Sequence, residues 1–354
     1  MKMGDTQTMP RIESLKMVGI LALALLLTGC QTVTPTDQQL PQLFTKQSQP
    51  VWEGNWLAGD PSIISQDGRY LLYYTSLLIT GDGDGDNPDN LQIVISVAES
   101  DDGINWRFAA PLTYGESVAL ENEKDGWDRV LETAFVKKVG EQYLMYYTGY
   151  SQEVNGVEDI VANGKIGVAR SADALTFARF LDEPVLAADS DFDRDGLFSP
   201  SVVYHDGLYY MIYTGWSLDL YGYGLFGATS TDGLTWQKDG RLLIAHSDVN
   251  WSLDNPREAE LVQGPDGLFY LFFTGDIAPN ESAFGLARAD HPFGPWQLYP
   301  DPVVFKTHDW EQSGLIAPTV LIEEKRIRLW YMAETDNFSN FYIGYAEMEF
   351  PLDW

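Results

Sequence analysis

Asp60-Pro61-Ser62-Ile63-Ile64, followed closely by Tyr70-Leu71-Leu72-Tyr73-Tyr74-Thr75, opens a pattern that the chain repeats five times. Each repeat begins with a short, mostly apolar segment, turns, and continues into a segment rich in tyrosine and phenylalanine. The first segments are Asp60–Ile64, Glu132–Val136, Ser199–Val203, Glu258–Val262 and Ala317–Leu321. Aromatic and β-branched residues favour strands, and nearly continuous apolarity predicts strands that are buried on both faces.

The spacing of the repeats predicts how these strands are arranged. A third segment, such as Ile166–Ala169, follows in each repeat and leads in several cases into a turn of the form Asp-Gly-x-x-Trp, as at Asp232–Trp236. Successive repeats are 59 to 72 residues apart. Several strands in each such period are typical of a propeller, whereas a β-sandwich does not predict this self-similarity. We therefore expect an all-β fold, a five-bladed β-propeller formed as a single domain by residues 52–354, closed by pairing of its first and last segments.

Composition limits the partners of the chain. Its 354 residues include 22 Lys and Arg against 52 Asp and Glu, a formal net charge of −30. Because nucleic acids and anionic lipid surfaces bind basic patches, this charge argues against both. Hydrophobic residues make up 45%, which is enough for a sizeable core, and the single cysteine excludes an internal disulfide framework. We expect a monomer.

The N-terminal residues predict export and anchoring. Residues 1–29 have the form of a secretory signal, with basic residues before an apolar run, Met17–Leu27, that is too short to span a bilayer. The run ends in Leu27-Thr28-Gly29-Cys30, which resembles a bacterial lipobox and implies that Cys30 is lipidated. A Gln/Thr/Pro-rich stretch then predicts a flexible tether over residues 30–51. We expect a protein anchored by lipid in the cell envelope, in the outer membrane or on its periplasmic or outer side.

Acidic residues recur at one position of the first segments. Aligning the five repeats places Asp60, Glu132, Ser199, Glu258 and Ala317 at the same position. The innermost strand of each propeller blade lines the central channel, so these side chains are expected to converge at one end of it. Burial of carboxylates beside each other costs free energy and drives their pKa values apart. One protonated acid and one ionised carboxylate are what hydrolysis of a glycosidic bond requires.

At these residues the chain resembles the five-bladed propellers of glycoside hydrolase families 43 and 32. The resemblance covers the whole predicted propeller and implies that Asp60 is the general base, or the nucleophile as in family 32. It implies that Glu258, in Arg257-Glu258-Ala259-Glu260, is the general acid. Glu260 lies two residues further on and would share a strand face with Glu258, so it is a rival acid. The families carry a further Asp on the preceding repeat, where this chain has Ser199. Glu132 or Asp195 would have to take over its role, or the protein binds glycans without cutting them.

Other residues are candidates for contact with the sugar. Trp56, Trp216 and Tyr150 are predicted to lie in loops, where they would stack on sugar rings or pack within the fold. Arg257 and Ser199 adjoin the aligned acids and are also expected to bind substrate. Basic residues near the channel mouth are few, which favours water over phosphate as the acceptor.

No metal or cofactor is required by these motifs. The acidic loop 81–90 imitates the start of an EF-hand, but Asn87 and Ile93 stand where Gly and Glu are needed, so that interpretation fails. A solvated acidic loop is the expectation, with a calcium site of another kind as the alternative. The sequence therefore predicts a surface-anchored glycoside hydrolase, with Asp60, Glu258 and Glu132 as catalytic residues. The alternatives are a catalytically inactive glycan-binding lipoprotein of the cell surface and an outer-membrane scaffold that binds no sugar.

Overall fold

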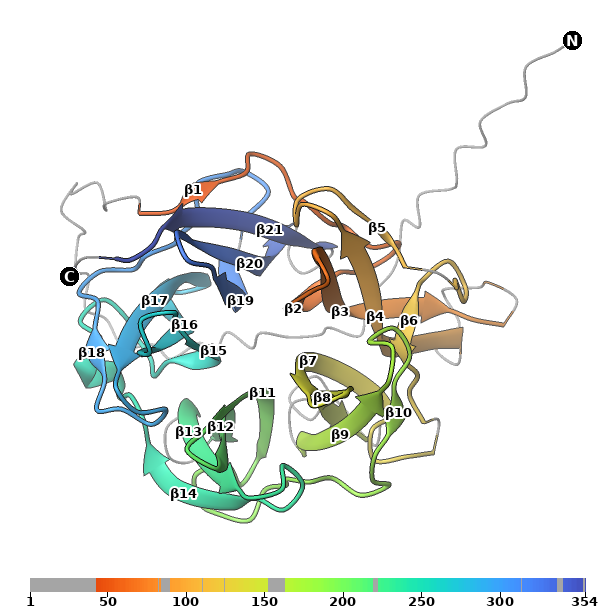
Figure 1. Cartoon of the computed structure of the whole chain (residues 1–354), viewed down its shortest axis with the longest axis horizontal. Helices are drawn as coiled ribbons and strands as arrows, with labels where there is room; N and C mark the ends of the chain where they lie inside the picture. Colours follow the sequence, from red (N-terminus) through yellow and green to blue (C-terminus); the bar gives the residue numbers. More distant parts are fainter. Residues whose placement is uncertain are drawn as a thin grey trace, which may run out of the picture.

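The computed structural model describes residues 43–81, 83, 90–109, 111–123, 125–151, 163–218, 222–312, 314–335, 340–352 and 354. Five small antiparallel sheets surround a central axis, and a short 3-10 helix, η2 (His246–Asp248), lies between two of them (Figure 1). The predicted five-bladed β-propeller is confirmed.

The blades follow the repeats of the sequence, each with its first strand innermost. Blade 1 contains β2 (Gly59–Gln66), β3 (Arg69–Ile79), β4 (Leu91–Ser100) and β5 (Trp106–Phe108), with β6 (Val118–Leu120) also paired to β4. Blade 2 contains β7 (Val130–Val139), β8 (Gln142–Tyr150), β9 (Lys165–Ser171) and β10 (Ala178–Arg179). Blade 3 contains β11 (Gly196–His205), β12 (Leu208–Ser217), β13 (Gly222–Ser230) and β14 (Gln237–Leu242). Blade 4 contains β15 (Arg257–Gln263), β16 (Phe269–Ala278), β17 (Glu281–Ala289) and β18 (Gln297–Leu298), and blade 5 contains β19 (Leu315–Ile322), β20 (Arg326–Thr335), β21 (Asn340–Glu349) and β1 (Thr45–Lys46).

The innermost strands form a closed ring around the channel. Each of β2, β7, β11, β15 and β19 contacts the innermost strands of both neighbouring blades. The hydrophobic core lies between adjacent blades, and one cluster joins Tyr73 of blade 1 to Val136 of blade 2. Because both faces of each sheet are covered, the strands are apolar along most of their length, as the sequence predicted.

Strand β1 closes the ring and corrects one predicted boundary. Thr45 and Lys46 pair with Glu347 and Ala346 of β21, so the first and last segments share blade 5, as predicted. Phe44 is fully buried in the core between blades 4 and 5. The propeller therefore includes residues 43–51, which were predicted to belong to the flexible tether 30–51. The sequence hid this strand because it is only two residues long and carries no alternating pattern.

The turns at Gly103, Ala174 and Gly233 fasten blades 1, 2 and 3 to the preceding blade. In the turn after β13, the Ser230 hydroxyl accepts the N–H of Asp232 and of Gly233, and the Asp232 carboxylate accepts two further backbone N–H groups. Tyr146 of blade 2 donates its hydroxyl to the Gly233 carbonyl (3.0 Å), and its ring packs edge-on against Trp236. The aromatic residue of the turn thus fills space between two adjacent sheets.

Four buried carboxylates outside the channel accept a hydrogen bond from a tyrosine on the second strand of their blade. The pairs are Tyr74 with Glu116 (2.6 Å), Tyr147 with Asp128 (2.8 Å), Tyr213 with Asp193 (3.2 Å) and Tyr331 with Glu311 (2.6 Å). We call these pairs the carboxylate latches. Three of them also bind a cation: Arg179 on Asp128, Lys238 on Asp193 and Lys46 on Glu311.

Candidate active site

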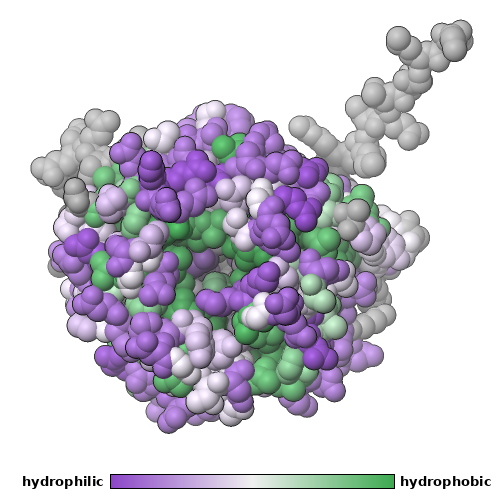
Figure 2. All heavy atoms as spheres, viewed as in Figure 1, coloured by the Kyte–Doolittle hydropathy of each residue, from purple (hydrophilic) through white to green (hydrophobic). Residues whose placement is uncertain are grey.

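Residues near the start of the five innermost strands line a pocket at one end of the channel. Its walls are formed by Asp60, Pro61, Thr133, Ala134, Phe135, Ser199, Pro200, Ser201, Glu258, Ala259, Glu260 and Ala317. Figure 2 shows a hollow at the centre of the ring. The structure thus brings the predicted base, Asp60, and the predicted acid, Glu258, into one pocket.

A bulge near the start of every innermost strand gives the pocket its shape. The register against the second strand shifts there, for example between Gly59 and Ser62 in blade 1. One residue within each bulge has a positive φ: Asp60 (45°), Thr133 (46°), Ser199 (51°), Glu258 (44°) and Ala317 (53°). This backbone conformation costs a side-chain-bearing residue about 1–2 kcal/mol, and such strain collects at functional sites.

The bulges correct the predicted alignment in blade 2. Thr133, and not Glu132, is equivalent to Asp60 and Glu258, because Thr133 carries the positive φ. Glu132 lies one residue earlier, at the position that Arg257 occupies in blade 4. The sequence concealed this shift because two adjacent polar residues precede Ala134, where blades 1, 3 and 5 have a proline that marks the register.

Threonines in the second strands hold the bulges of the next blade. The hydroxyls of Thr75, Thr148 and Thr214 accept the backbone N–H groups of Thr133 (3.4 Å), Ser199 (3.2 Å) and Glu258 (2.8 Å), respectively. A bulge removes an N–H group from its own ladder, so a partner from the neighbouring blade is needed. This explains why the tyrosine-rich segments end in threonine, a signal whose role sequence reasoning missed.

Asp60 is a buried carboxyl held by neutral donors. Thr75 donates its hydroxyl to Oδ2 (2.9 Å), and the backbone of Thr133 gives a second hydrogen bond. Burial raises the pKa of Asp60 to about 6, against the opposing effect of these two donors. Near neutral pH the side chain is therefore mostly ionised and able to accept a proton.

Glu258 lies in β15, the innermost strand of blade 4. Like Asp60, it is held without a dedicated cation. Burial raises its pKa to about 7, while Arg257 lowers it and Asp60 raises it further. A backbone hydrogen bond from Ala317 reaches the carboxylate, and Oε2 is buried with no partner among the described residues. An acid of this kind carries its proton in about half of the molecules at pH 7 and in more of them at lower pH, and can donate it to a substrate.

Glu132 completes an electrostatically coupled group of carboxyls. Burial raises its pKa to about 8, and the negative charge of Asp60 adds to this effect, whereas a hydrogen bond with Tyr150 opposes it. Burial likewise raises the pKa of the Tyr150 phenol, and Glu132, Asp60 and Glu258 all contribute. Tyr150, which lies buried at the end of β8 and not in a loop, therefore stands among all three carboxyls.

Glu260, the rival acid, lies deeper in the channel, and its carboxyl group is held by residues of neighbouring blades. Its carboxylate interacts with the Thr319 hydroxyl, the Val320 backbone and Lys137, although burial still raises its pKa to about 8. At the same level of neighbouring strands, Ser201 accepts the N–H of Leu261 (2.9 Å) from the next blade. Glu260 thus joins a ring of bonds between blades, which favours Glu258 as the acid.

Ser199 leaves blade 3 without a carboxylate in the pocket. Its hydroxyl is buried with no hydrogen-bond partner among the described residues, and it lines the pocket. Asp195 does not replace the missing group, because its Oδ2 accepts the Leu218 N–H (2.8 Å) at the end of β12. Of the two substitutes suggested by the sequence, Glu132 is the one that reaches the other carboxyls.

The structure places three predicted substrate contacts in different surroundings. Arg257 makes a bidentate ion pair with Asp276 (2.7 and 2.9 Å), so its charge is already neutralised. Trp216 lies in β12, 2% exposed, and stacks on Tyr223, so the prediction of a loop tryptophan is wrong there. Trp56 is 41% exposed on the loop before β2 and remains a candidate.

Most residues on which the metal and membrane predictions depend lie outside the described part of the chain. Cys30 lies outside the described residues, and so do Asp82 and residues 84–89 of the acidic loop. Within the described part of the chain, no group of three or more His, Cys, Asp or Glu is arranged to hold a metal ion. The same part contains no helix with the length and apolar character needed to cross a membrane.

Comparison with known proteins finds partial relatives. No family model matches the chain. A 1,2-beta-oligomannan phosphorylase from Thermoanaerobacter sp. (strain X514) is 29% identical over 137 residues, covering 36% of this chain and 43% of the relative. An uncharacterised protein of Mycobacterium tuberculosis (strain CDC 1551 / Oshkosh) is 26% identical over 166 residues, covering 47% and 48%. The chain thus spans less than half the length of the curated relatives it matches.

Solved structures match over most of the propeller. A thermostable family-43 glycoside hydrolase has a TM-score of 0.60 at 18% identity, covering 85% of this chain and 93% of that chain. The endo-arabinase from Bacteroides thetaiotaomicron VPI-5482 has a TM-score of 0.60 at 15% identity, covering 86% and 97%. A GH130 structure, from a family of mannoside phosphorylases with glycoside hydrolases that target β-1,2 mannosidic linkages in Candida mannan, has a TM-score of 0.60 at 19% identity, covering 86% and 89%. The chain therefore has the five-bladed β-propeller fold of these glycoside hydrolases.

Proposed function

We propose that this protein is a glycoside hydrolase that cleaves glycosidic bonds of oligo- or polysaccharides in the pocket of the propeller channel. One observation carries the proposal: two buried carboxyls, Asp60 and Glu258, line the same pocket with pKa values raised to about 6 and about 7. Titratable groups with perturbed pKa values in one cleft are candidates for a catalytic acid and base.

The two carboxyls divide the chemistry between them. Near pH 6.5, between the two pKa values, most Asp60 side chains are ionised and most Glu258 side chains are protonated. Glu258 donates its proton to the glycosidic oxygen as the bond to the anomeric carbon breaks. Asp60 either takes a proton from the attacking water or attacks the anomeric carbon itself, and water supplies the new hydroxyl in both cases. Glu132, whose pKa is about 8, stays neutral and adds no further charge beside Asp60.

Water is the proposed acceptor, rather than phosphate. Neither lysine nor arginine is among the described residues that line the pocket, and the nearby Arg257 is bound to Asp276. A phosphate dianion placed next to Asp60 would meet a negative charge without a compensating cation. The relative named as an oligomannan phosphorylase and the glycoside hydrolases of the same fold support a carbohydrate substrate.

The test is release of reducing sugar from a panel of neutral oligo- and polysaccharides, with and without inorganic phosphate. Glu258→Gln and Asp60→Asn should each lower turnover by at least two orders of magnitude. The exposed Glu141→Gln, in the turn between β7 and β8, is the matched control and should behave as wild type. Activity of Glu258→Gln near the wild-type level would refute the assignment of the acid.

A catalytically inactive glycan-binding protein is the second candidate, and Ser199 is the observation that favours it. Binding of a glycan in an affinity gel, with no sugar released from that glycan by the same preparation, would support this candidate. Restoring a carboxylate with Ser199→Asp would then be informative, because gain of hydrolysis would identify the missing group as the cause.

We further propose that the protein is a monomer anchored by lipid in the cell envelope. The lipobox-like Leu27-Thr28-Gly29-Cys30 supports this proposal. Labelling with radioactive palmitate in the producing bacterium and partition into detergent should both be lost in Cys30→Ser. Retention of the label in that variant would overturn the anchor.

A further inference from the structure

We propose that Trp56 and Tyr114 form an aromatic platform on blade 1, outside the pocket, that binds the continuing part of a neutral glycan chain. The proposal rests on the proposed function, since it extends the same site from one cleaved bond to a longer substrate. Aromatic side chains present large, rigid apolar faces, which suit the apolar faces of sugar rings.

The two loops that carry these aromatics are joined to each other. Glu116 is fully buried, and its Oε1 accepts the backbone N–H of Asn55 (2.6 Å), next to Trp56. Its Oε2 accepts the Tyr74 hydroxyl (2.6 Å), so the joint is anchored to β3. A β-carbon at Gly115 would lie 2.7 Å from the Asn55 side chain, which shows how closely the loops pack. The loop segments that carry Trp56 and Tyr114 are thus held next to each other.

Tyr114 occupies a position that packing does not explain. It lies at the tip of a two-residue hairpin in which Thr113 and Glu116 exchange backbone hydrogen bonds (2.7 and 3.0 Å). The φ angles of Tyr114 and Gly115 are 50° and 86°, a turn that favours glycine or asparagine at both positions. The tyrosine is strained there while its side chain is 56% exposed, so neither the backbone nor the core accounts for it.

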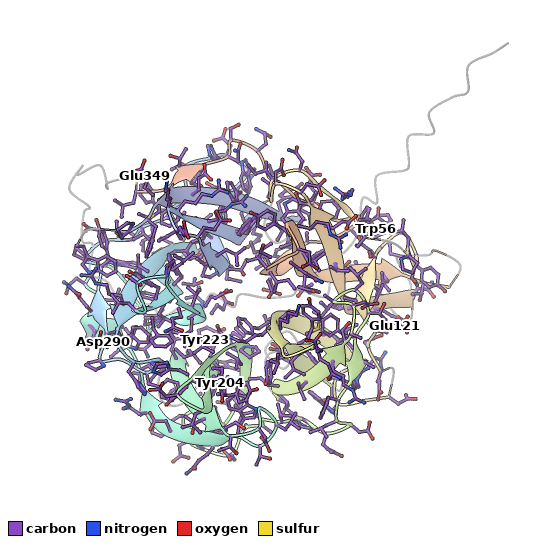
Figure 3. All side chains as sticks on the ribbon, viewed as in Figure 1. Trp56, Glu121, Tyr204, Tyr223, Asp290 and Glu349 are labelled. Carbon is purple, nitrogen blue, oxygen red and sulfur yellow. The ribbon has the colours of Figure 1, made fainter. Side chains whose placement is uncertain are left out.

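The platform lies close to the pocket. Trp56 precedes Asp60 by four residues, which limits the distance between their Cα atoms to about 14 Å. Leu57, between them, is buried against Ile316 and Met332, with the pocket residue Ala317 packed on the same cluster. Figure 3 shows Trp56 on blade 1. A short oligosaccharide cut at Asp60 can therefore reach the platform.

Charge restricts the glycan to a neutral one. The pocket wall contains carboxyls but, among its described residues, no lysine or arginine to pair with an acidic sugar. Glu53, three residues before Trp56, is exposed, and the whole chain has a formal net charge of −30. Such a surface repels an anionic polymer at low and moderate ionic strength.

Trp56→Ala and Tyr114→Asn test the platform independently, because asparagine tolerates the positive φ of the hairpin. The matched control is Tyr204→Ala, since Tyr204 is 52% exposed near the C-terminal end of β11, at the end of blade 3 away from the pocket. Each platform variant should lower kcat/KM about tenfold on long neutral chains and less than twofold on a disaccharide of the same linkage. An equal loss on both substrates, or the same loss in Tyr204→Ala, would overturn the platform.

A binding measurement separates this proposal from the proposed function. Yeast mannan and debranched arabinan are the neutral probes in an affinity gel, and polygalacturonate is the anionic probe. Retardation of the wild type by a neutral probe, weakened in both platform variants but not in Tyr204→Ala, supports the platform even if no sugar is released. Wild-type-like retardation of the platform variants, or stronger binding to polygalacturonate than to both neutral probes, would overturn it.

Discussion

Glu132→Gln is the most informative single change in the pocket region. Glu132 is buried, its pKa is raised to about 8 by burial and by the charge of Asp60, and glutamine has nearly the shape of its protonated form. The variant therefore keeps the neutral state that the folded protein has near pH 7 and removes only the ability to ionise. Stability and activity should respond differently to this change.

The direction of the stability change follows from the difference between the pKa of Glu132 in the unfolded chain and its pKa in the folded chain. In the unfolded chain Glu132 has the ordinary pKa of 4.5, and in the fold it has a pKa of about 8. Its full contribution to stability is present below pH 4.5 and is lost as the pH rises towards 8, because only the unfolded chain ionises freely in this range. The loss is about 1.4 kcal/mol for each pH unit, hence below about 1 kcal/mol at pH 5 and about 3 kcal/mol at pH 7.

Glutamine removes this loss, so the variant should be more stable than wild type at pH 7. For a domain of this size the gain corresponds to a rise in Tm of about 5 °C at pH 7, and to a rise of about 1 °C at pH 5. Thermal unfolding followed by tryptophan fluorescence at both pH values measures it, with the exposed Glu141→Gln as control. At pH 6 the turnover of Glu132→Gln should stay within about tenfold of wild type. A lower Tm at pH 7, or the same shift at both pH values, would show that Glu132 is ionised in the fold and would refute this reasoning.

Three other changes test the acid assignment and the packing. Glu260→Gln should retain turnover within about tenfold of wild type, whereas Glu258→Gln loses it; the opposite order in a reducing-sugar assay would make Glu260 the acid. Deletion of Phe350–Trp354 should lower Tm by about 5 °C, since burial of an aromatic side chain of this kind is worth about 3 kcal/mol, and an unchanged Tm would contradict the role of this segment in packing on blade 4. Gly344→Ala should also lower Tm, because its β-carbon would lie 2.2 Å from the Tyr331 ring, and a fully stable variant would show that the ring can move.

The repeats made the fold predictable from sequence. A propeller blade must bury both faces of its sheet, so the same apolar and aromatic pattern returns in every blade and can be counted. Asp60-Pro61 marked the start of an innermost strand, and the turn at Asp232-Gly233 marked the outer hairpin. The pocket position of Asp60 and Glu258 followed from the same alignment, because equivalent residues of a ring converge on its axis.

Two kinds of feature were not predictable from the sequence. One depends on a one-residue shift in strand register, and the other on contacts between residues far apart in the chain. The bulge in blade 2 moves Thr133 into the position expected for Glu132, and no proline marks it. Trp216 was expected in a loop, but β12 extends to Ser217 and buries it against Tyr223. Strand β1 depends on pairing with β21, about 300 positions later in the chain, and its own two residues carry no pattern.

The contrast between two sets of buried carboxylates supports chemistry in the pocket. The carboxylate latches each accept a tyrosine hydroxyl, and Asp128, Asp193 and Glu311 also bind a cation. The fold can therefore neutralise a buried acid where only stability is needed. Asp60 and Glu258 are instead held by hydroxyl and backbone donors, and the nearest guanidinium, that of Arg257, is directed to Asp276. Because uncompensated burial of acids destabilises the folded state, their presence in the pocket is better explained by proton transfer to and from a substrate than by stability.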